Sequence, residues 1–76
     1  MLKIKDSVDL NGLEIFDFEY DGSKYVYRIS ETSYIYVTEN RFFEFDLDPT
    51  DDINLHCNQA AYVLWYLIQA GLVKKV

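Results

Sequence analysis

The sequence predicts an α+β fold, an antiparallel β-meander of about four strands packed against a long C-terminal helix, with room for a short N-terminal helix. Residues 16–20 and 43–47 alternate aromatic or apolar side chains with acidic ones, which is the period of half-buried strands. Residues 60–68 are apolar without interruption, as in a helix covered by its neighbours. No repeat or linker divides the chain, so residues 1–76 are expected to form one domain.

The composition bounds the class of protein. With 76 residues, the chain is near the lower limit for a self-sufficient core, and its 17% of aromatic residues help because each ring buries a large area. Its single cysteine excludes an internal disulfide and is typical of the reducing cytoplasm. The segment MLKIK lacks the apolar run of a signal peptide, and residues 60–68 are about half a bilayer span. We therefore expect a cytoplasmic protein without a membrane partner.

The first hairpin is predicted from a turn signal. Asp21-Gly22 is a favoured two-residue turn because both residues tolerate positive φ. This turn would set Phe18 opposite Tyr25 and point Tyr27 to the same face. The rings expected on this inner face are Phe16, Phe18, Tyr25 and Tyr27.

The second hairpin decides where the next pair of tyrosines points. The segment TEN suits a three-residue loop with its asparagine in the left-handed conformation, which sets Ile35 opposite Phe43. Tyr34 and Tyr36 then face outward, and Phe45 joins the core. A two- or four-residue loop would bury both tyrosines instead, since a slip of one residue reverses every side chain.

Two helices are expected beside the sheet. Ser7 or Asp9 can cap a short N-terminal helix, and Asp48-Pro49 begins a long one at residues 51–70 that Gly71 ends. Because residues 60–68 are apolar all round, one side should be covered by the sheet and the other by the N-terminal segment or another protomer. Trp65 is therefore expected to be almost solvent-free.

The distribution of charge along the chain indicates which classes of partner the protein can bind. The net charge is −6. Acidic residues cluster in residues 6–21 and 44–52, and neither segment contains a Lys or Arg. Direct binding of nucleic acid needs clustered cations, so it is not expected. A basic surface on a host protein fits as partner, and simple solubility is the alternative explanation of the acids.

No catalytic, cofactor or metal site is expected. Asp46, Asp48 and Thr50 match the Asp-x-Asp-x-Thr pattern of haloacid-dehalogenase-like phosphatases, but the chain has no room for the Rossmann-like domain that this motif needs. Capping of a helix accounts for Asp48 and Thr50. His56 and Cys57 point about 100° apart on a helix, and Cys57 is expected to be a small buried thiol. We therefore do not expect an enzyme.

A protein-binding surface is predicted on the outer face of the sheet. Aromatic side chains with an arginine inside a charged rim are typical of binding hot spots. The alternative is that another segment folds over this face and makes it core. The predicted partner-binding residues are Arg28, Tyr34, Tyr36, Phe42, Glu44, Asp46 and Asp48.

Residues 6–29, DSVDLNGLEIFDFEYDGSKYVYRI, with the terminal YLIQAGLVKKV, resemble short proteins of phages and prophages of Gram-positive bacteria. The resemblance covers about half the chain and brings no site residues. It implies a small acidic protein of the host cytoplasm that acts by stoichiometric protein–protein interaction, for example as an inhibitor of a CRISPR nuclease or another defence enzyme. The alternative is a homodimeric structural or accessory phage protein with no inhibitory role.

Overall fold

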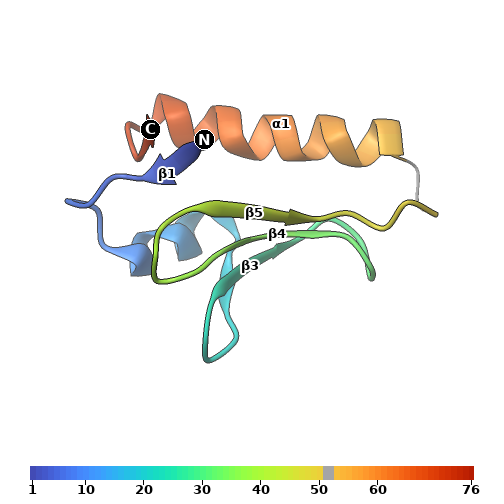
Figure 1. Cartoon of the computed structure of the whole chain (residues 1–76), viewed down its shortest axis with the longest axis horizontal. Coiled ribbons are helices and arrows are strands. Elements are labelled where there is room, and N and C mark those ends of the chain that lie inside the picture. The colour runs from blue at the N-terminus through green and yellow to red at the C-terminus, as the bar shows by residue number, and fades with distance from the viewer. Residues whose placement is uncertain (51–52) are drawn as a thin grey trace.

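The computed structural model describes residues 1–50 and 53–76, with side chains described for residues 1–50 and 57–76 (Figure 1). These residues form a four-stranded sheet, a two-stranded sheet, a 3₁₀ helix and an α-helix. The elements in chain order are β1 (Leu2–Ile4), η1 (Leu10–Phe16), β2 (Glu19–Tyr20), β3 (Tyr25–Arg28), β4 (Tyr34–Val37), β5 (Phe43–Asp46), α1 (Ile53–Gln69) and β6 (Val73–Lys75).

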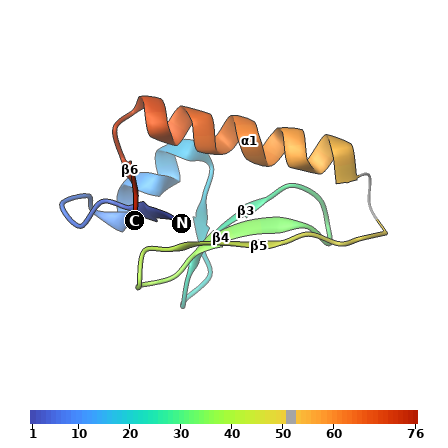
Figure 2. The same ribbon diagram turned by 45° about the horizontal axis from the view of Figure 1, so that its top comes forward.

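The larger sheet is an antiparallel meander in the order β2-β3-β4-β5. Helices α1 and η1 lie on the same face of this sheet, and β1 and β6 pair beside them (Figure 2). The predicted α+β class and four-stranded antiparallel sheet are thus confirmed. The prediction of a long C-terminal helix is wrong, because α1 ends at Gln69 and strand β6 is the last element of the chain.

The first hairpin has a longer loop than predicted. Tyr20 pairs with Tyr25, so four residues connect the strands instead of two. The Asp21 carboxylate accepts the backbone N–H groups of Ser23 and Lys24, both at 2.9 Å, and this side-chain turn replaces the two-residue turn. The register moves by two residues, which leaves the side chains of β2 and β3 on their predicted faces. Tyr25 is accordingly buried.

The second hairpin is also longer by two residues. Val37 pairs with Phe43, so the connection has five residues, and Arg41 takes the left-handed conformation (φ 73°) predicted for Asn40. Asn40 instead accepts the Phe42 N–H through its side chain at 3.0 Å. The even shift again preserves the faces, with Ile35 and Val37 fully buried.

Phe16 and Phe45 differ from their predicted positions on the inner face of the sheet. Phe16 belongs to η1 and not to a strand, and Asp9 caps this helix by accepting the Asn11 N–H at 3.0 Å. Phe45 shares the inner face with Ile35, its partner on β4, but it is 48% exposed. Its predicted place in the core is therefore wrong, because β5 is the last strand of the meander and this side chain lies at the margin of the core.

Helix α1 ends as predicted, but Pro49, which was expected in its first turn, is not helical. Gly71 is left-handed (φ 77°), its N–H donates to Ile68 O, and the Leu72 N–H donates to Leu67 O, the paired bonds of a Schellman cap. Pro49 lies in a turn before the helix. Asp51, the predicted helix start, lies outside the described residues.

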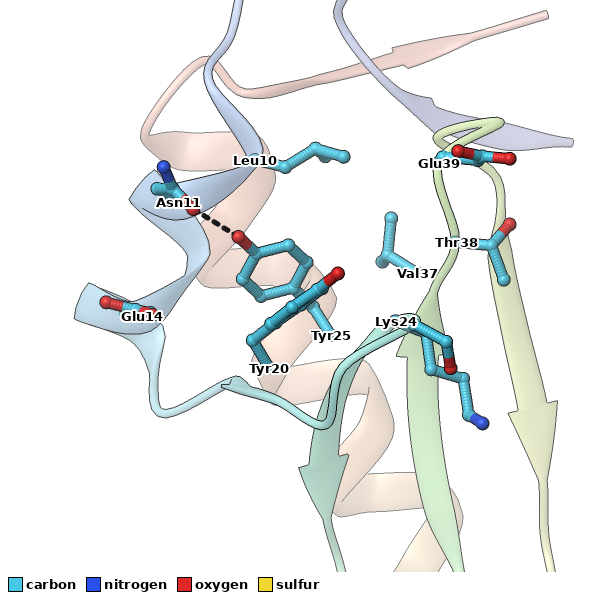
Figure 3. A pocket seen from close by; sticks show the side chains of 10 residues that line it. Leu10, Asn11, Glu14, Tyr20, Lys24, Tyr25, Val37, Thr38 and Glu39 are labelled. Atoms are coloured by element: carbon cyan, nitrogen blue, oxygen red, sulfur yellow. Dashed lines mark hydrogen bonds between the residues drawn. The ribbon is translucent and has the colours of Figure 1, made fainter.

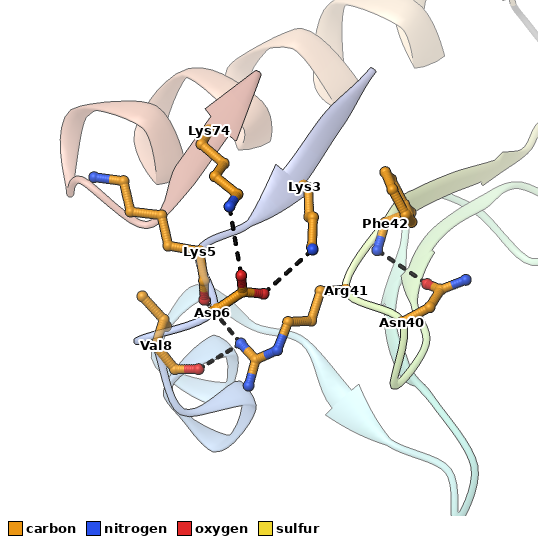
Figure 4. Close-up of polar contacts among 8 residues, drawn as sticks. All are labelled: Lys3, Lys5, Asp6, Val8, Asn40, Arg41, Phe42 and Lys74. Carbon is orange, nitrogen blue, oxygen red and sulfur yellow. Dashed lines mark hydrogen bonds and ion pairs between the residues drawn. The ribbon is translucent and has the colours of Figure 1, made fainter. Parts of the chain in front are cut away.

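The two chain ends pair with each other, a feature that the sequence analysis does not predict. Strand β1 is antiparallel to β6, and the terminal amine of Met1 donates to Val76 O at 3.0 Å. Asp6 forms ion pairs with Lys3 at 3.2 Å and Lys74 at 3.5 Å (Figure 4). The ends are therefore joined by both backbone and side-chain contacts.

Arg41 connects this terminal pair to the larger sheet. Its guanidinium donates to the carbonyl oxygens of Lys5 at 2.8 Å and Val8 at 2.6 Å, and its own carbonyl accepts the Ile4 N–H at 2.9 Å (Figure 4). Ile4 is fully buried in the core. Among the described side chains, the buried hydrophobic residues are Ile4, Leu13, Phe18, Tyr25, Ile35, Val37, Phe43, Ala60, Val63 and Leu67.

The described part of α1 buries one stripe only. Ala60, Val63 and Leu67 face the core at helical spacing, whereas Trp65 is 53% exposed. The expectation of a solvent-free Trp65 is thus wrong for the single chain. Cys57 is also exposed and not the buried thiol that was expected.

Burial separates two substitutions by their effect on stability. Leu67 is fully buried, so Leu67→Ala should lower the free energy of unfolding by about 2–5 kcal/mol. Phe45→Ala should cost roughly 1 kcal/mol because the ring is already half in water. Urea unfolding monitored by circular dichroism measures both values. Equal losses would contradict the packing described here.

The stability contributed by the Asp6 ion pairs at the chain ends should depend on pH. The hydrogen bond and charge of Lys3, with the charge of Lys74, hold the pKa of Asp6 below its ordinary value of 3.8. A lowered pKa contributes stability above pH 3.8 that is lost as pH falls through the folded value. Asp6→Asn should therefore lose less melting temperature than the wild type between about pH 5 and pH 2. Lys3→Gln is the matched test. Added to Asp6→Asn, it should change the loss of melting temperature at low pH little further, because the ion pair is already absent.

Candidate protein-interaction surface

The outer sheet face is the side of the larger sheet turned away from both helices. The register places Arg28 opposite Tyr34, Tyr34 opposite Asp46, and Tyr36 opposite Glu44. Within the described part of the chain, no helix or strand covers this side (Figure 2). The outer sheet face comprises Val26, Arg28, Tyr34, Tyr36, Glu44 and Asp46.

Five of the predicted residues therefore come together, and two do not. Phe42 precedes β5 and bridges to Lys3, whose ammonium lies 5.6 Å from the Phe42 ring centre (Figure 4). Asp48 lies beyond the end of β5, and its carboxylate accepts the N–H and hydroxyl of Thr50 at 2.9 and 2.7 Å. Asp48 thus supports a turn at Pro49 and Thr50 instead of capping a helix there as predicted, and it also lies outside the outer sheet face.

A tyrosine pair forms the centre of the outer sheet face. The rings of Tyr34 and Tyr36 lie 6.1 Å apart at 47°, and both are partly exposed. Lys24 places its ammonium 5.5 Å from the centre of the Tyr36 ring, within the range of a cation–π contact. The prediction omitted Lys24, although strand alternation already put it on this side of the sheet.

The acids beside this pair act on it directly. A hydrogen bond to Asp46, together with the charge of this carboxylate and burial, raises the pKa of Tyr34 above its ordinary value of 10.0. Glu44 and Asp46 are both exposed at the end of the sheet. The surface thus combines aromatic faces with acceptor groups, which suits a lysine or arginine side chain from a partner.

The tyrosine pair borders an open hollow of about 600 Å³. Its wall continues from the pair to the β2–β3 turn at Ser23 and to Glu39 on the next loop. The lining carries charges of both signs, because Lys24 lies there with Glu39 and Asp46. The two carboxylates can receive a basic side chain while neighbouring residues contact the partner around it.

A second hollow lies between η1 and the sheet, on the inner side. It has a volume of about 370 Å³, and the Tyr25 hydroxyl there donates to the Asn11 side-chain oxygen (Figure 3). Burial, with the charges of Glu14 and Asp9, raises the pKa of Tyr25. This contact fixes η1 on the sheet and thereby supports the core.

The residues of the phosphatase-like pattern are arranged differently from that motif. Asp46 ends the last strand of an antiparallel sheet, whereas the motif follows a central parallel strand. Among the described residues, no three His, Cys, Asp or Glu side chains are grouped closely enough to hold a metal ion. His56 falls among the side chains that are not described.

Comparisons with known proteins add no assignment. No protein-family model, curated protein or solved structure matches the chain. No helix in the described residues is long and apolar enough to cross a membrane.

The contact between Tyr34 and Asp46 should affect the ionisation of the Tyr34 phenol. Asp46→Asn removes the negative charge that opposes loss of the phenol proton, so the pKa of Tyr34 should fall toward 10.0. Chemical-shift titration of tyrosine-labelled protein above pH 9 would measure this change. Glu44→Gln is the matched control, because Glu44 lies opposite Tyr36 and should leave the pKa of Tyr34 nearly unchanged. The same shift in both variants would argue against a specific contact.

Proposed function

We propose that this chain is a stoichiometric protein-binding protein that uses its outer sheet face to engage a basic surface on another protein. The observation that supports this best is the partly exposed Tyr34–Tyr36 pair beside Glu44 and Asp46, on a side of the sheet without a covering element in the described residues. Tyrosine is enriched in binding hot spots because it offers a large rigid face and a polar end.

The charge of the chain favours a basic partner. Thirteen acidic residues against seven basic ones give the net charge of −6, which would repel a phosphate backbone. The same charge would steer the protein toward a surface rich in lysine and arginine, such as one that normally holds nucleic acid. The protein would then act as an inhibitor by occupying that surface, with one copy bound at each site.

The phage resemblance gives this proposal a biological setting. A small acidic phage protein that covers the nucleic-acid-binding surface of a host defence enzyme, such as a CRISPR nuclease, would act in the host cytoplasm. Adding purified protein to a CRISPR nuclease at increasing ratios and measuring DNA cleavage tests this setting directly. Inhibition should be complete near one copy per binding site and should weaken as salt rises. This action needs neither a cofactor nor a catalytic residue of the chain.

A homodimeric structural or accessory protein is the second candidate function. It is favoured by a different observation, the exposed aromatic residues of α1, which lie on the other side of the molecule from the outer sheet face.

The two kinds of residue on the outer sheet face should affect binding kinetics differently. Tyr36→Ala should leave the fold intact and raise the off-rate, costing about 2 kcal/mol of binding if the ring is a hot spot. Charge reversal at Glu44 and Asp46 should mainly slow association, because it removes the attraction that guides the encounter. Surface plasmon resonance with a partner captured from bacterial lysate would measure both rates.

A matched control separates local from overall charge. Glu14→Lys makes the same charge change on η1, away from the outer sheet face, and should slow association less than Asp46→Lys. If the two reversals have equal effects, net charge alone accounts for the steering. If Tyr36→Ala lowers the melting temperature as much as Leu67→Ala, Tyr36 is part of the core and the proposed surface is wrong.

A further inference from the structure

Helix α1 exposes an aromatic face on the side away from the sheet. Tyr62, Trp65 and Tyr66 are each more than half exposed, and Ile68 is nearly half exposed. Figure 1 shows no other element above this side of the helix. We call this surface the helix outer face, and it comprises Asn58, Ala61, Tyr62, Trp65, Tyr66, Ile68 and Gln69.

The helix outer face is large for such a small protein. An aromatic side chain has roughly 150–250 Å² of surface, so the exposed parts of three rings amount to about 350 Å². Single chains rarely expose a continuous apolar patch beyond a few hundred Å² unless it has a binding role. The rings of Trp65 and Tyr66 pack edge to face at 5.2 Å and, with Ala61, line a shallow groove of about 470 Å³.

The charge of this face selects among partners. The sequence of α1 from Ile53 to Gln69 contains no Asp, Glu, Lys or Arg. A strongly charged partner would therefore gain no ionic contact here. A second copy of the chain, which carries the same net charge of −6, can approach this neutral face with the least repulsion.

The spacing along the helix matches a second copy in the opposite direction. Asn58, Tyr62, Trp65 and Gln69 follow one another at steps of four, three and four residues, the spacing of a helix-packing seam. This series reads the same in both directions. A two-fold axis between Tyr62 and Trp65 would thus set Tyr62 of one copy opposite Trp65 of the other, and Asn58 opposite Gln69.

We propose that the helix outer face is a homodimer interface in which two α1 helices pack antiparallel. The facing rings bury each other, and the two amide side chains at each end can both donate and accept hydrogen bonds. Beside the seam, small Ala61 falls near Ile68 of the other copy, which gives the larger side chain room. A parallel arrangement would instead place each residue on its own copy and set two bulky Trp65 rings against each other.

The dimensions suit a dimer that dissociates on dilution. A helix of 17 residues is about 26 Å long, and a standard interface buries about 800 Å² per partner from a total surface here of 5012 Å². The seam alone falls short of that area. Ile15, which is 83% exposed and borders a groove with Tyr62 and Tyr66, lies where it can extend the contact.

This dimer is independent of the proposed partner binding. Helix α1 and the outer sheet face lie on opposite sides of the larger sheet, so pairing through α1 leaves both outer sheet faces free (Figure 2). Loss of the dimer would not abolish binding by a single outer sheet face, and loss of partner binding would not affect the dimer. The two proposals can therefore fail separately.

Sedimentation velocity across about 1–200 µM protein tests the dimer. We expect a concentration-dependent shift from one to two copies, accompanied by a blue shift in the fluorescence of Trp65, the only tryptophan of the chain. A single copy throughout this range overturns the proposal. Transfer of the protein to neutral phosphatidylcholine vesicles without any dimer in solution also overturns it, because the face would then bind lipid.

Charge pairs at the seam ends test the antiparallel arrangement. Asn58→Glu with Gln69→Lys sets opposite charges against each other only in an antiparallel dimer, so affinity should be kept or increased. Asn58→Glu with Gln69→Glu sets like charges together and should weaken the dimer by about tenfold or more at low salt. Both sites are exposed, so circular dichroism should show an unchanged fold. Equal weakening by the two pairs would overturn the antiparallel interface.

Discussion

The pairing of the two chain ends is the constraint on which the arrangement of the other elements depends. Strand β6 follows α1 after a single left-handed turn at Gly71, so its pairing with β1 fixes where the helix ends. Ile4 on β1 is fully buried, and Arg41 joins the following loop to the larger sheet. The terminal pair thus connects α1 to the meander through both packing and hydrogen bonds, although few residues take part.

The faces of the sheet could be predicted from the sequence, and the loops could not. Alternation along β3 and β4 is a local property, so Tyr25 was correctly placed inside and the Tyr34–Tyr36 pair outside. Both loops are two residues longer than predicted because side chains, those of Asp21 and Asn40, bond to the backbone within them. The even slip preserved the faces, and for this reason five of the seven predicted site residues still share one surface.

Features that depend on distant contacts were missed. Nothing in the short segment LKI indicates that it pairs with VKK some 70 residues later, because neither strand has a turn to join them. The exposure of Trp65 also follows from the tertiary arrangement, since an apolar run does not reveal how many sides of a helix the same chain can cover. The exposure of Phe45 was missed for a similar reason. Alternation predicts which face of the sheet the side chain is on, but not whether that position lies inside the core or at its margin.

The architecture leaves two uncovered surfaces that differ in chemistry. One layer of helix on one face of a sheet covers only the facing sides, so the far side of each layer stays open. The outer sheet face is aromatic and carries Glu44 and Asp46 beside Arg28, so it offers ionic contacts to a charged partner. The helix outer face is aromatic and uncharged. It therefore favours another copy of the chain, whose like charge would repel it at the other faces. A chain with a net charge of −6 can therefore use the charged side to find a different protein and the neutral side to meet itself.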